Sequence, residues 1–152
     1  MANWAITSYR IEGSKSDLER VYGVIDDFLS ERRKPVKENA SKEWEGNIVK
    51  ALGATDEQIS DNYLRGFIQE YEMDDNTIRI EADEAWGATD FRHLLEQLIP
   101  KLIVYYIVEE PGNEVYATND REGKYFTYLF YVDTCIGGNY EGEYFTNKGT
   151  VL

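Results

Sequence analysis

Acidic side chains near the predicted ends of two strands are the first candidates for chemistry in this sequence. Glu81, Asp83 and Glu84 lie toward the end of one strand pattern, and Glu109 and Glu110 lie toward the end of another. Two carboxyl groups that are brought close together can take different pKa values and act as acid and base. Acidic residues are abundant throughout this chain, so we favour the simpler interpretation that these five form a solvated acidic rim.

Other catalytic and metal-binding patterns are weak. The single cysteine, Cys135, and the single histidine, His93, are far apart, whereas zinc sites need several such ligands at close spacing. No Gly-x-Ser-x-Gly motif occurs. Residues 74–76 and 119–123 carry oxygen side chains but match no calcium loop, so we interpret both as hairpin turns. We expect His93 to face solvent and Cys135 to be a small buried or half-buried side chain, and we predict no catalytic residue, metal or cofactor.

Aromatic residues form the second group with functional potential. They make up 14% of the chain, and eleven of them lie between residues 105 and 145. Tyrosine and tryptophan contribute strongly to protein interfaces, so Tyr105, Tyr116 and Tyr125 are candidate residues for binding a ligand or partner. Trp86 is a fourth candidate, as the wall of a pocket at a strand-to-helix junction. For Trp86 we favour the alternative that the side chain anchors the core.

The charge is strongly negative and unevenly distributed. The formal net charge is −13, yet residues 1–53 hold nine acidic and nine basic side chains, whereas residues 54–152 hold twenty acidic and seven basic ones. A negative surface repels phosphate, so we expect no direct binding of nucleic acid. One cluster of cations interrupts this pattern, and we interpret it as complementing the dipole at the end of the first helix: Arg32, Arg33, Lys34 and Lys37.

Length and composition indicate one globular domain in a reducing compartment. The chain has 152 residues, an apolar fraction of 42% and one cysteine, which excludes an internal disulfide. The first ten residues do not resemble a signal peptide, and the longest apolar run, 102–108, is too short to span a bilayer. We therefore expect a cytoplasmic protein without membrane association.

Hydrophobic periodicity in the first part of the chain predicts one strand followed by helices. Residues 3–12 alternate as a strand does. Residues 17–33 carry an apolar stripe at helical spacing, and residues 16–19 at the start of this segment match a capping box. A shorter helix is predicted over 43–52, and the second capping-box pattern at 55–58 opens one more helical turn.

The next part predicts a hairpin, a helix and a buried strand. Strands over 63–72 and 77–84 flank the turn at 74–76, Thr89 caps a helix that Pro100 stops, and residues 102–108 form a strand. Within 77–84 one face of the strand is apolar and the other polar: Ile78, Ile80 and Ala82 against Thr77, Arg79, Glu81 and Asp83. The order is that of a split βαβ unit, so the chain predicts an α+β, ferredoxin-like βαββαβ sandwich with both crossover helices on one face.

The chain continues beyond this core. Residues 114–118 and 124–133 are further strand patterns on either side of the turn at 119–123. A four-stranded core of this kind leaves one sheet face uncovered, so we expect the aromatic tail to extend the sheet or fold over that face. We therefore describe residues 1–152 as one domain, with a ferredoxin-like core in 1–112 and a β-rich C-terminal extension in 113–152 packed on it.

Several strand-end and turn segments resemble those of a family. They are Asn3-Trp4 with Ile11-Glu12-Gly13, Arg65-Gly66-Phe67-Ile68, Glu84-Ala85-Trp86, and Tyr105-Tyr106 running into Glu109-Glu110-Pro111-Gly112. Together they resemble a group of uncharacterised ferredoxin-like proteins found in phages, plasmids and gut Bacteroides. The resemblance implies the same fold and a mobile-element setting. It implies no activity and no catalytic residue.

Three functions follow as hypotheses. The leading one is a non-enzymatic binding or interaction module, whose partner is another protein or a second copy in a homodimer. The first alternative is an acidic nucleic-acid mimic that inhibits a DNA-binding host enzyme, which the charge of residues 54–152 suggests. The second alternative is an enzyme that uses carboxylates on the sheet face, which would require a cleft holding at least two of them close together.

Overall fold

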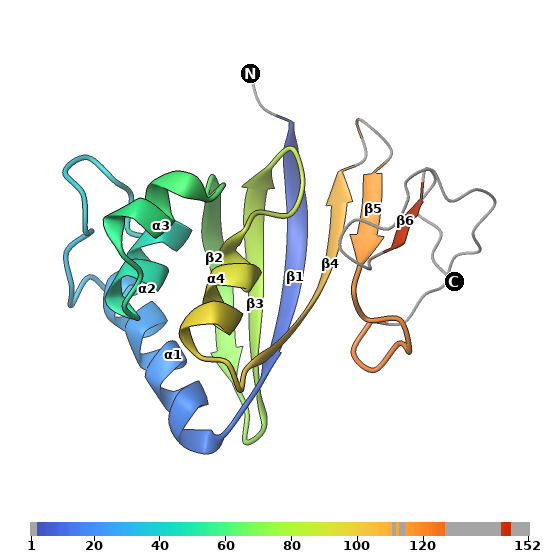
Figure 1. Ribbon diagram of the computed structural model, residues 1–152, viewed down its shortest axis with the longest axis horizontal. Helices are drawn as coiled ribbons and strands as arrows, with labels where there is room; N and C mark the ends of the chain where they lie inside the picture. Colours follow the sequence, from blue (N-terminus) through green and yellow to red (C-terminus); the bar gives the residue numbers. More distant parts are fainter. Residues whose placement is uncertain (1–2, 111, 113–114, 127–143, 147–152) are drawn as a thin grey trace.

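One antiparallel sheet organises the protein. The computed structural model describes residues 3–110, 112, 115–126 and 144–146. Strands pair in the order β2-β3-β1-β4-β5-β6, each antiparallel to its neighbour (Figure 1). The strands are β1 (Trp4–Glu12), β2 (Gly66–Met73), β3 (Thr77–Ala85), β4 (Ile103–Glu110), β5 (Val115–Thr118) and the three-residue β6 (Tyr144–Thr146). The predicted α+β class is thereby confirmed.

Among the described residues, four helices lie on one side of the sheet (Figure 1). They are α1 (Lys15–Leu29), α2 (Glu45–Ala51), α3 (Asp56–Asp61) and α4 (Phe91–Leu98). The first three lie between β1 and β2 in the chain, and α4 lies between β3 and β4. Within the part of the chain that the structure describes, no helix is long and apolar enough to cross a membrane.

Alternation along the strands separates two faces of the sheet. On the helix side, Tyr9 and Ile11 of β1 are fully buried, and the apolar residues predicted to share one face of β3 are buried with them. On the opposite side, Trp4 and Ile6 are exposed. We call this second side the open face, and on the central strand it comprises Trp4, Ile6, Ser8, Arg10 and Glu12. The helix side holds the core, because the apolar stripes of α1 and α4 pack there.

The first helix starts and ends earlier than its sequence predicts. Ser14 is its N-cap, with Oγ accepting from the Asp17 amide at 3.1 Å, so the capping box expected at 16–19 is wrong. The helix ends at Leu29 rather than 33, because Glu31 takes a left-handed conformation (φ 61°) that closes the last turn.

The cations after α1 therefore do not lie in its last turn, and the dipole interpretation is wrong. Arg32 instead pairs with Asp26 at 2.5 Å and Asp27 at 3.1 Å, and this pairing lowers the pKa of Asp26. Arg33 lies over the Phe28 ring at 5.2 Å, and Lys37 lies over the Trp44 ring at the same distance.

Other local predictions are met more closely. The Thr55 hydroxyl accepts from the Gln58 amide at 3.0 Å and the Gln58 side chain accepts from the Thr55 amide at 2.9 Å, which confirms the second capping box. The expected turn at 74–76 is held by Asp74, whose carboxylate accepts from the amides of Asn76 and Thr77. Both devices are local, so the sequence alone predicts them.

The start of α4 and the end of β4 differ from expectation. Asp90, not Thr89, occupies the N-cap of α4, and the Thr89 hydroxyl makes only a long contact of 3.3 Å with the Phe91 amide. The Thr89 hydroxyl is held instead by two carboxyl groups in the core. Strand β4 begins at Ile103 and runs on to Glu110, two residues beyond the apolar run.

The chain after β4 first extends the sheet and then turns over its open face. Residues 115–118 of the strand predicted over 114–118 form β5, which pairs with β4. Residues 124–126 do not continue the second predicted strand, because the Asp120 carboxylate accepts from the amides of all three residues, at 2.9, 2.9 and 3.0 Å, and holds them in a loop. The rest of that prediction, 127–133, and Cys135 lie outside the described residues.

Candidate functional site

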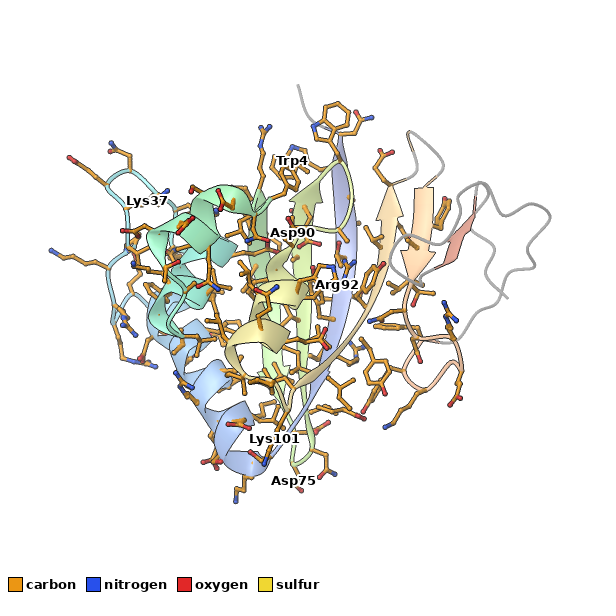
Figure 2. All side chains as sticks on the ribbon, in the orientation of Figure 1. Trp4, Lys37, Asp75, Asp90, Arg92 and Lys101 are labelled. Carbon is orange, nitrogen blue, oxygen red and sulfur yellow. The ribbon has the colours of Figure 1, made fainter. Side chains whose placement is uncertain are left out.

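The end of the open face where the chain begins is rich in exposed apolar side chains. Ile6 is 59% exposed and Trp4 is 45% exposed. The Trp4 ring packs against Phe67 of β2 at 5.8 Å, with the Arg65 guanidinium 5.5 Å away over the indole. Figure 2 places Trp4 at this end of β1. Large apolar side chains exposed together on a folded protein are typical of interaction surfaces.

Trp86 adds an exposed aromatic ring next to this end. It is 51% exposed, so the interpretation as a core anchor is wrong. Its backbone takes φ 69°, a left-handed conformation that costs a bulky residue on the order of 1 kcal/mol. The Trp86 amide donates to the Asn3 carbonyl at 2.7 Å, which ties the residue to the start of β1. The fold therefore holds an indole in solvent despite backbone strain.

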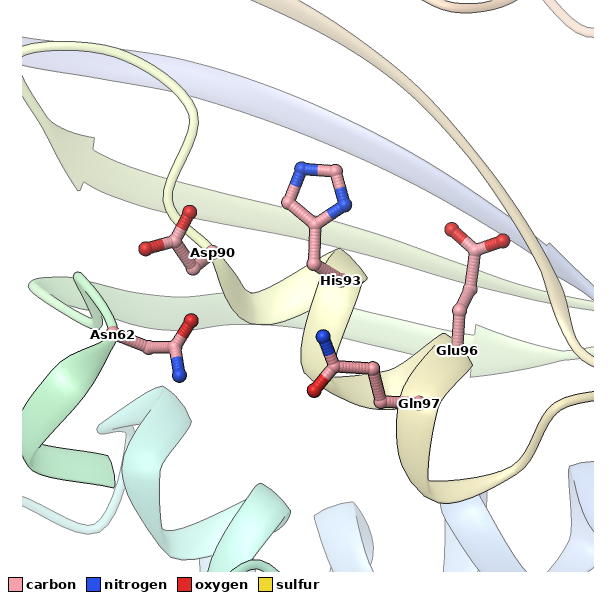
Figure 3. A pocket seen from close by; sticks show the side chains of 5 residues that line it. All are labelled: Asn62, Asp90, His93, Glu96 and Gln97. Atoms are coloured by element: carbon pink, nitrogen blue, oxygen red, sulfur yellow. The ribbon is translucent and has the colours of Figure 1, made fainter. Parts of the chain in front are cut away.

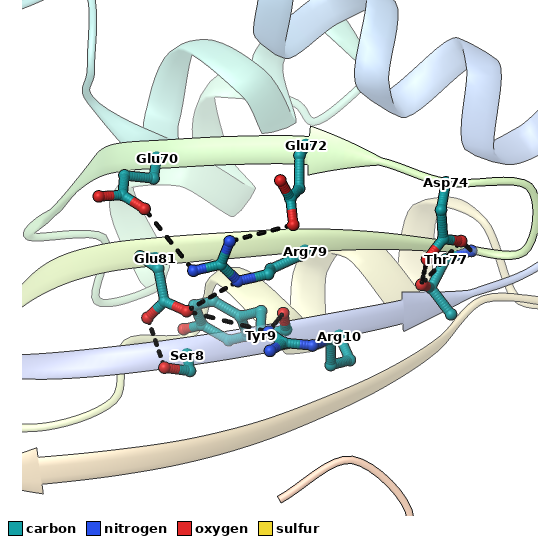
Figure 4. A network of polar contacts seen from close by, with 9 residues as sticks. All are labelled: Ser8, Tyr9, Arg10, Glu70, Glu72, Asp74, Thr77, Arg79 and Glu81. Carbon is teal, nitrogen blue, oxygen red and sulfur yellow. Dashed lines mark hydrogen bonds and ion pairs between the residues drawn. The ribbon is translucent and has the colours of Figure 1, made fainter.

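A network of alternating charges occupies the middle of the open face (Figure 4). Arg79 lies within 3.6 Å of Glu70, 3.0 Å of Glu72 and 3.4 Å of Glu81. Arg10 approaches Glu81 at 3.9 Å. Hydrogen bonding to Glu72 raises the pKa of Arg79, whereas partial burial lowers that of Arg10. Each of these acids therefore has a cation beside it.

The far end of the open face brings two of the predicted site residues together. The rings of Tyr105 and Tyr125 meet at 5.2 Å. The Tyr125 hydroxyl and the Lys124 ammonium both donate to Glu12. Burial, followed by the hydrogen bond to Glu12, raises the pKa of Tyr125. Phe126 lies beneath the Arg10 guanidinium at 5.4 Å. This end is therefore covered by the chain itself.

The four predicted site residues thus divide between two ends of the sheet. Tyr105 and Tyr125 contact each other at one end. Tyr116 of β5 lies opposite Glu109 of β4. Trp86 directly follows β3, whose last residue pairs with Trp4. Sequence reasoning missed the exposed pair Trp4 and Ile6. A signal was available, because both faces of β1 carry large apolar residues and the burial of one face does not account for those on the other.

The five acidic residues predicted to form a solvated rim are not all exposed. Glu81 and Asp83 are half-buried and Glu109 is exposed, but Glu84 and Glu110 are buried at 0% and 3% exposure on the helix side, so the interpretation is wrong for these two. Burying a carboxylate is costly unless hydrogen bonds or a proton compensate it.

Glu84 forms a buried carboxyl pair with Glu45, the first residue of α2. The Thr89 hydroxyl lies 2.6 Å from Glu45 Oε2 and 2.7 Å from Glu84 Oε2. The Tyr9 hydroxyl donates to Glu84, at 2.8 Å from Oε1 and 2.7 Å from Oε2. Glu45 is fully buried, and its Oε1 finds no hydrogen-bond partner among the described residues. The sequence did not reveal this pair, because its members are 39 residues apart and neither belongs to a motif.

The pair must hold a proton. The Thr89 hydroxyl has a single hydrogen and can donate to one carboxyl only, so its other short contact requires a hydrogen on the second carboxyl. Burial, reinforced by the charge of Glu84, raises the pKa of Glu45 well above its usual value. Glu45 therefore donates to Thr89, which donates to Glu84. Two close carboxyl groups do exist in this protein, but they lie in the core and not on the open face.

Two neighbours shape this buried cluster. A Cβ on Gly66 of β2 would come within 2.4 Å of the Glu45 carboxyl, so glycine is needed there for close approach. Arg92 of α4 is 2% exposed, and its guanidinium lies 4.0 Å from the centre of the Tyr106 ring (Figure 2). The electrostatic effect of Arg92 opposes the rise that burial and Glu84 cause in the pKa of Tyr9.

One polar pocket lies on the outer side of α4 (Figure 3). It has a volume of about 420 Å³ and is lined by Asn62, Asp90, His93, Glu96 and Gln97. His93 is half-buried, so it is less exposed than expected. Asp90 is already engaged, since its carboxylate accepts from the Tyr63 amide at 2.7 Å. A wall made entirely of polar side chains differs from the apolar wall typical of small-molecule sites.

Neither a metal-binding cluster among the described residues nor a similar known protein indicates a function. Among the residues the structure describes, no three histidine, cysteine or acidic side chains are placed to hold a metal ion. No family model, no curated protein and no solved structure matches the chain.

Proposed function

We propose that this protein is a non-enzymatic binding module and that its open face, at the end marked by Trp4 and Ile6, receives a protein partner. The observation that carries the proposal is the exposure of Ile6, which at 59% is the highest among the exposed large apolar side chains of the described residues, on a strand that lies inside the sheet between β3 and β4. A large apolar side chain that faces solvent from an inner strand contributes burial energy only when another surface covers it.

The proposal includes a ferredoxin-like core with a C-terminal extension. Support comes from the strand order β2-β3-β1-β4, from the crossovers through α1 and α4, and from the pairing of β5 with β4. In this architecture the helices occupy one face of the sheet and leave the other available for binding. We also propose that the protein belongs to a mobile element and that it lies in the cytoplasm.

The two alternatives have less support. A nucleic-acid mimic needs rows of acids without neighbouring cations, but the middle of the open face alternates acids with Arg10 and Arg79. An enzyme on the sheet face needs close carboxyl groups there, and the close pair, Glu45 with Glu84, lies on the helix side at 0% exposure.

Affinity capture with matched baits tests the proposal. The wild-type protein and an Ile6→Glu variant serve as parallel baits in extracts of the producing cells, and light scattering measures the mass of each pure protein. We expect the wild type to retain a protein that the variant loses, or to self-associate where the variant does not. Two monomeric proteins with identical captured sets would contradict the proposal. Ile6 is 59% exposed, so the change removes little packing, and circular dichroism checks that the variant folds with a third carboxylate between Asp83 and Glu109.

A further inference from the structure

Ile6 is flanked by two acidic side chains on the open face. In the strand register it lies opposite Asp83 of β3 on one side and Glu109 of β4 on the other. Side chains directly opposite each other on neighbouring antiparallel strands have Cβ atoms about 5 Å apart. Phe67 lies opposite Asp83 on β2 and continues the apolar surface to Trp4. We call the group Ile6, Asp83, Glu109, Trp4 and Phe67 the Ile6 patch.

These two acids differ from the other acids of the face. Glu70, Glu72 and Glu81 each have Arg79 within 4 Å. Among the described residues, neither Asp83 nor Glu109 has a cation within ion-pair distance. At this end the Arg65 guanidinium lies over the Trp4 indole, 5.5 Å from the ring centre. The patch therefore presents an apolar centre between two carboxyl groups that form no ion pair with any residue the structure describes.

We infer that the Ile6 patch binds a protein segment in which an apolar side chain is flanked on both sides by Lys or Arg. This inference rests on the proposed function and specifies the partner. Covering Ile6 with an apolar side chain removes its exposed surface from water. Cations on either side of that side chain then meet Asp83 and Glu109, which charge complementarity favours.

Charge disfavours the other occupants of the patch. A second copy in a twofold dimer would place the same acids against each other, because such an interface joins identical surfaces. Phosphate groups would meet the same two carboxylates, and the whole chain carries a net charge of −13. A segment that is both cationic and apolar is the occupant that complements the exposed apolar surface and the two carboxylates.

Short synthetic peptides provide the probe. In an extended chain, residues two apart lie on one face at a spacing of about 6.6 Å. The probe is therefore a capped peptide containing Lys-Ser-Trp-Ser-Lys, and its matched control contains Glu-Ser-Trp-Ser-Glu. Titration into ¹⁵N-labelled full-length protein is followed by the amide chemical shifts. We expect the lysine peptide to shift the amides of Ile6, Asp83 and Glu109 with a millimolar or tighter dissociation constant, and the glutamate peptide to leave them unchanged.

Two double variants of equal charge locate the effect. Asp83→Asn with Glu109→Gln should weaken binding of the lysine peptide roughly threefold to tenfold at low salt, the range expected for two exposed ion pairs. Glu70→Gln with Glu72→Gln removes the same charge from the Arg79 network and should change the affinity less than about twofold. The amide spectrum of each variant confirms its folding.

Three results would overturn the inference: equal binding of the glutamate peptide, no shift at the Ile6 patch with the lysine peptide, or equal weakening by the two double variants. The capture experiment separates this failure from that of the proposed function. If Ile6→Glu loses a captured protein while the peptides fail, the face binds a partner of different chemistry. If capture also fails to depend on Ile6, the binding function itself is lost.

Discussion

Glu45→Gln tests the proton that the structure places in the core. Glutamine has the shape of a protonated glutamate, and its amide can donate to Thr89 as the Glu45 carboxyl does. The chain of hydrogen bonds from residue 45 through Thr89 to Glu84 therefore survives the change. What the variant removes is the ability of residue 45 to lose its proton.

The sign and size of the effect follow from proton linkage. Burial and the charge of Glu84 raise the pKa of Glu45, so the folded protein keeps a proton that the unfolded chain releases above about pH 4.3. For one proton, the free energy of unfolding then falls by about 1.4 kcal/mol for each unit of rising pH, until the pH reaches the folded-state pKa. The variant lacks this contribution and should be the more stable protein at neutral and alkaline pH.

Urea unfolding from pH 4 to 9 measures the effect. We expect the difference in unfolding free energy between variant and wild type to grow with pH at up to about 1.4 kcal/mol per unit and then to level off. The control is Glu38→Gln, the same substitution at an exposed loop carboxylate. A constant difference across this pH range would refute the buried proton. A variant that is less stable than wild type at pH 8 would refute the assigned hydrogen bonds.

Three further changes test the packing described above. Gly66→Ala should cost about 1–3 kcal/mol of unfolding free energy, because its Cβ would meet the Glu45 carboxyl at 2.4 Å, and a Glu45→Ala background should reduce that cost. Trp86→Gly should change stability by no more than about 1 kcal/mol, since relief of the φ 69° strain offsets lost contacts; a loss of 3–5 kcal/mol, as for a buried tryptophan, would contradict it. Deletion of 113–152 bares the edge of β4 and should give an aggregated or unfolded protein by light scattering and circular dichroism, and a soluble, cooperative product would contradict that role.

Local physical chemistry made much of the architecture predictable. The alternation of Ile78, Ile80 and Ala82 with polar residues needs only the period of a strand, and the structure buries those three side chains as expected. The turn at Asp74 and the cap at Thr55 likewise depend on residues close in the chain. The α+β class follows from the order of such elements.

Predictions failed where distant segments compete for the same residue. Thr89 has the chemistry of a cap, but its hydroxyl is held by two carboxyl groups that arrive from α2 and β3. Residues 124–126 have a strand composition, yet Asp120 binds their amides and keeps them in a loop. In both cases a polar side chain satisfies groups that the local pattern assigned elsewhere.

The sequence by itself determined the strands, the helices, the negative charge and the richness in aromatic residues, because each depends on composition or on neighbours along the chain. Only the tertiary structure decided the fate of individual side chains. Strand pairing set Ile6 between Asp83 and Glu109, and the packing of α2 over Gly66 placed Glu45 beside Glu84. Exposure and proton sharing are properties of groups brought together from distant positions, and they were decided when the sheet and helices assembled.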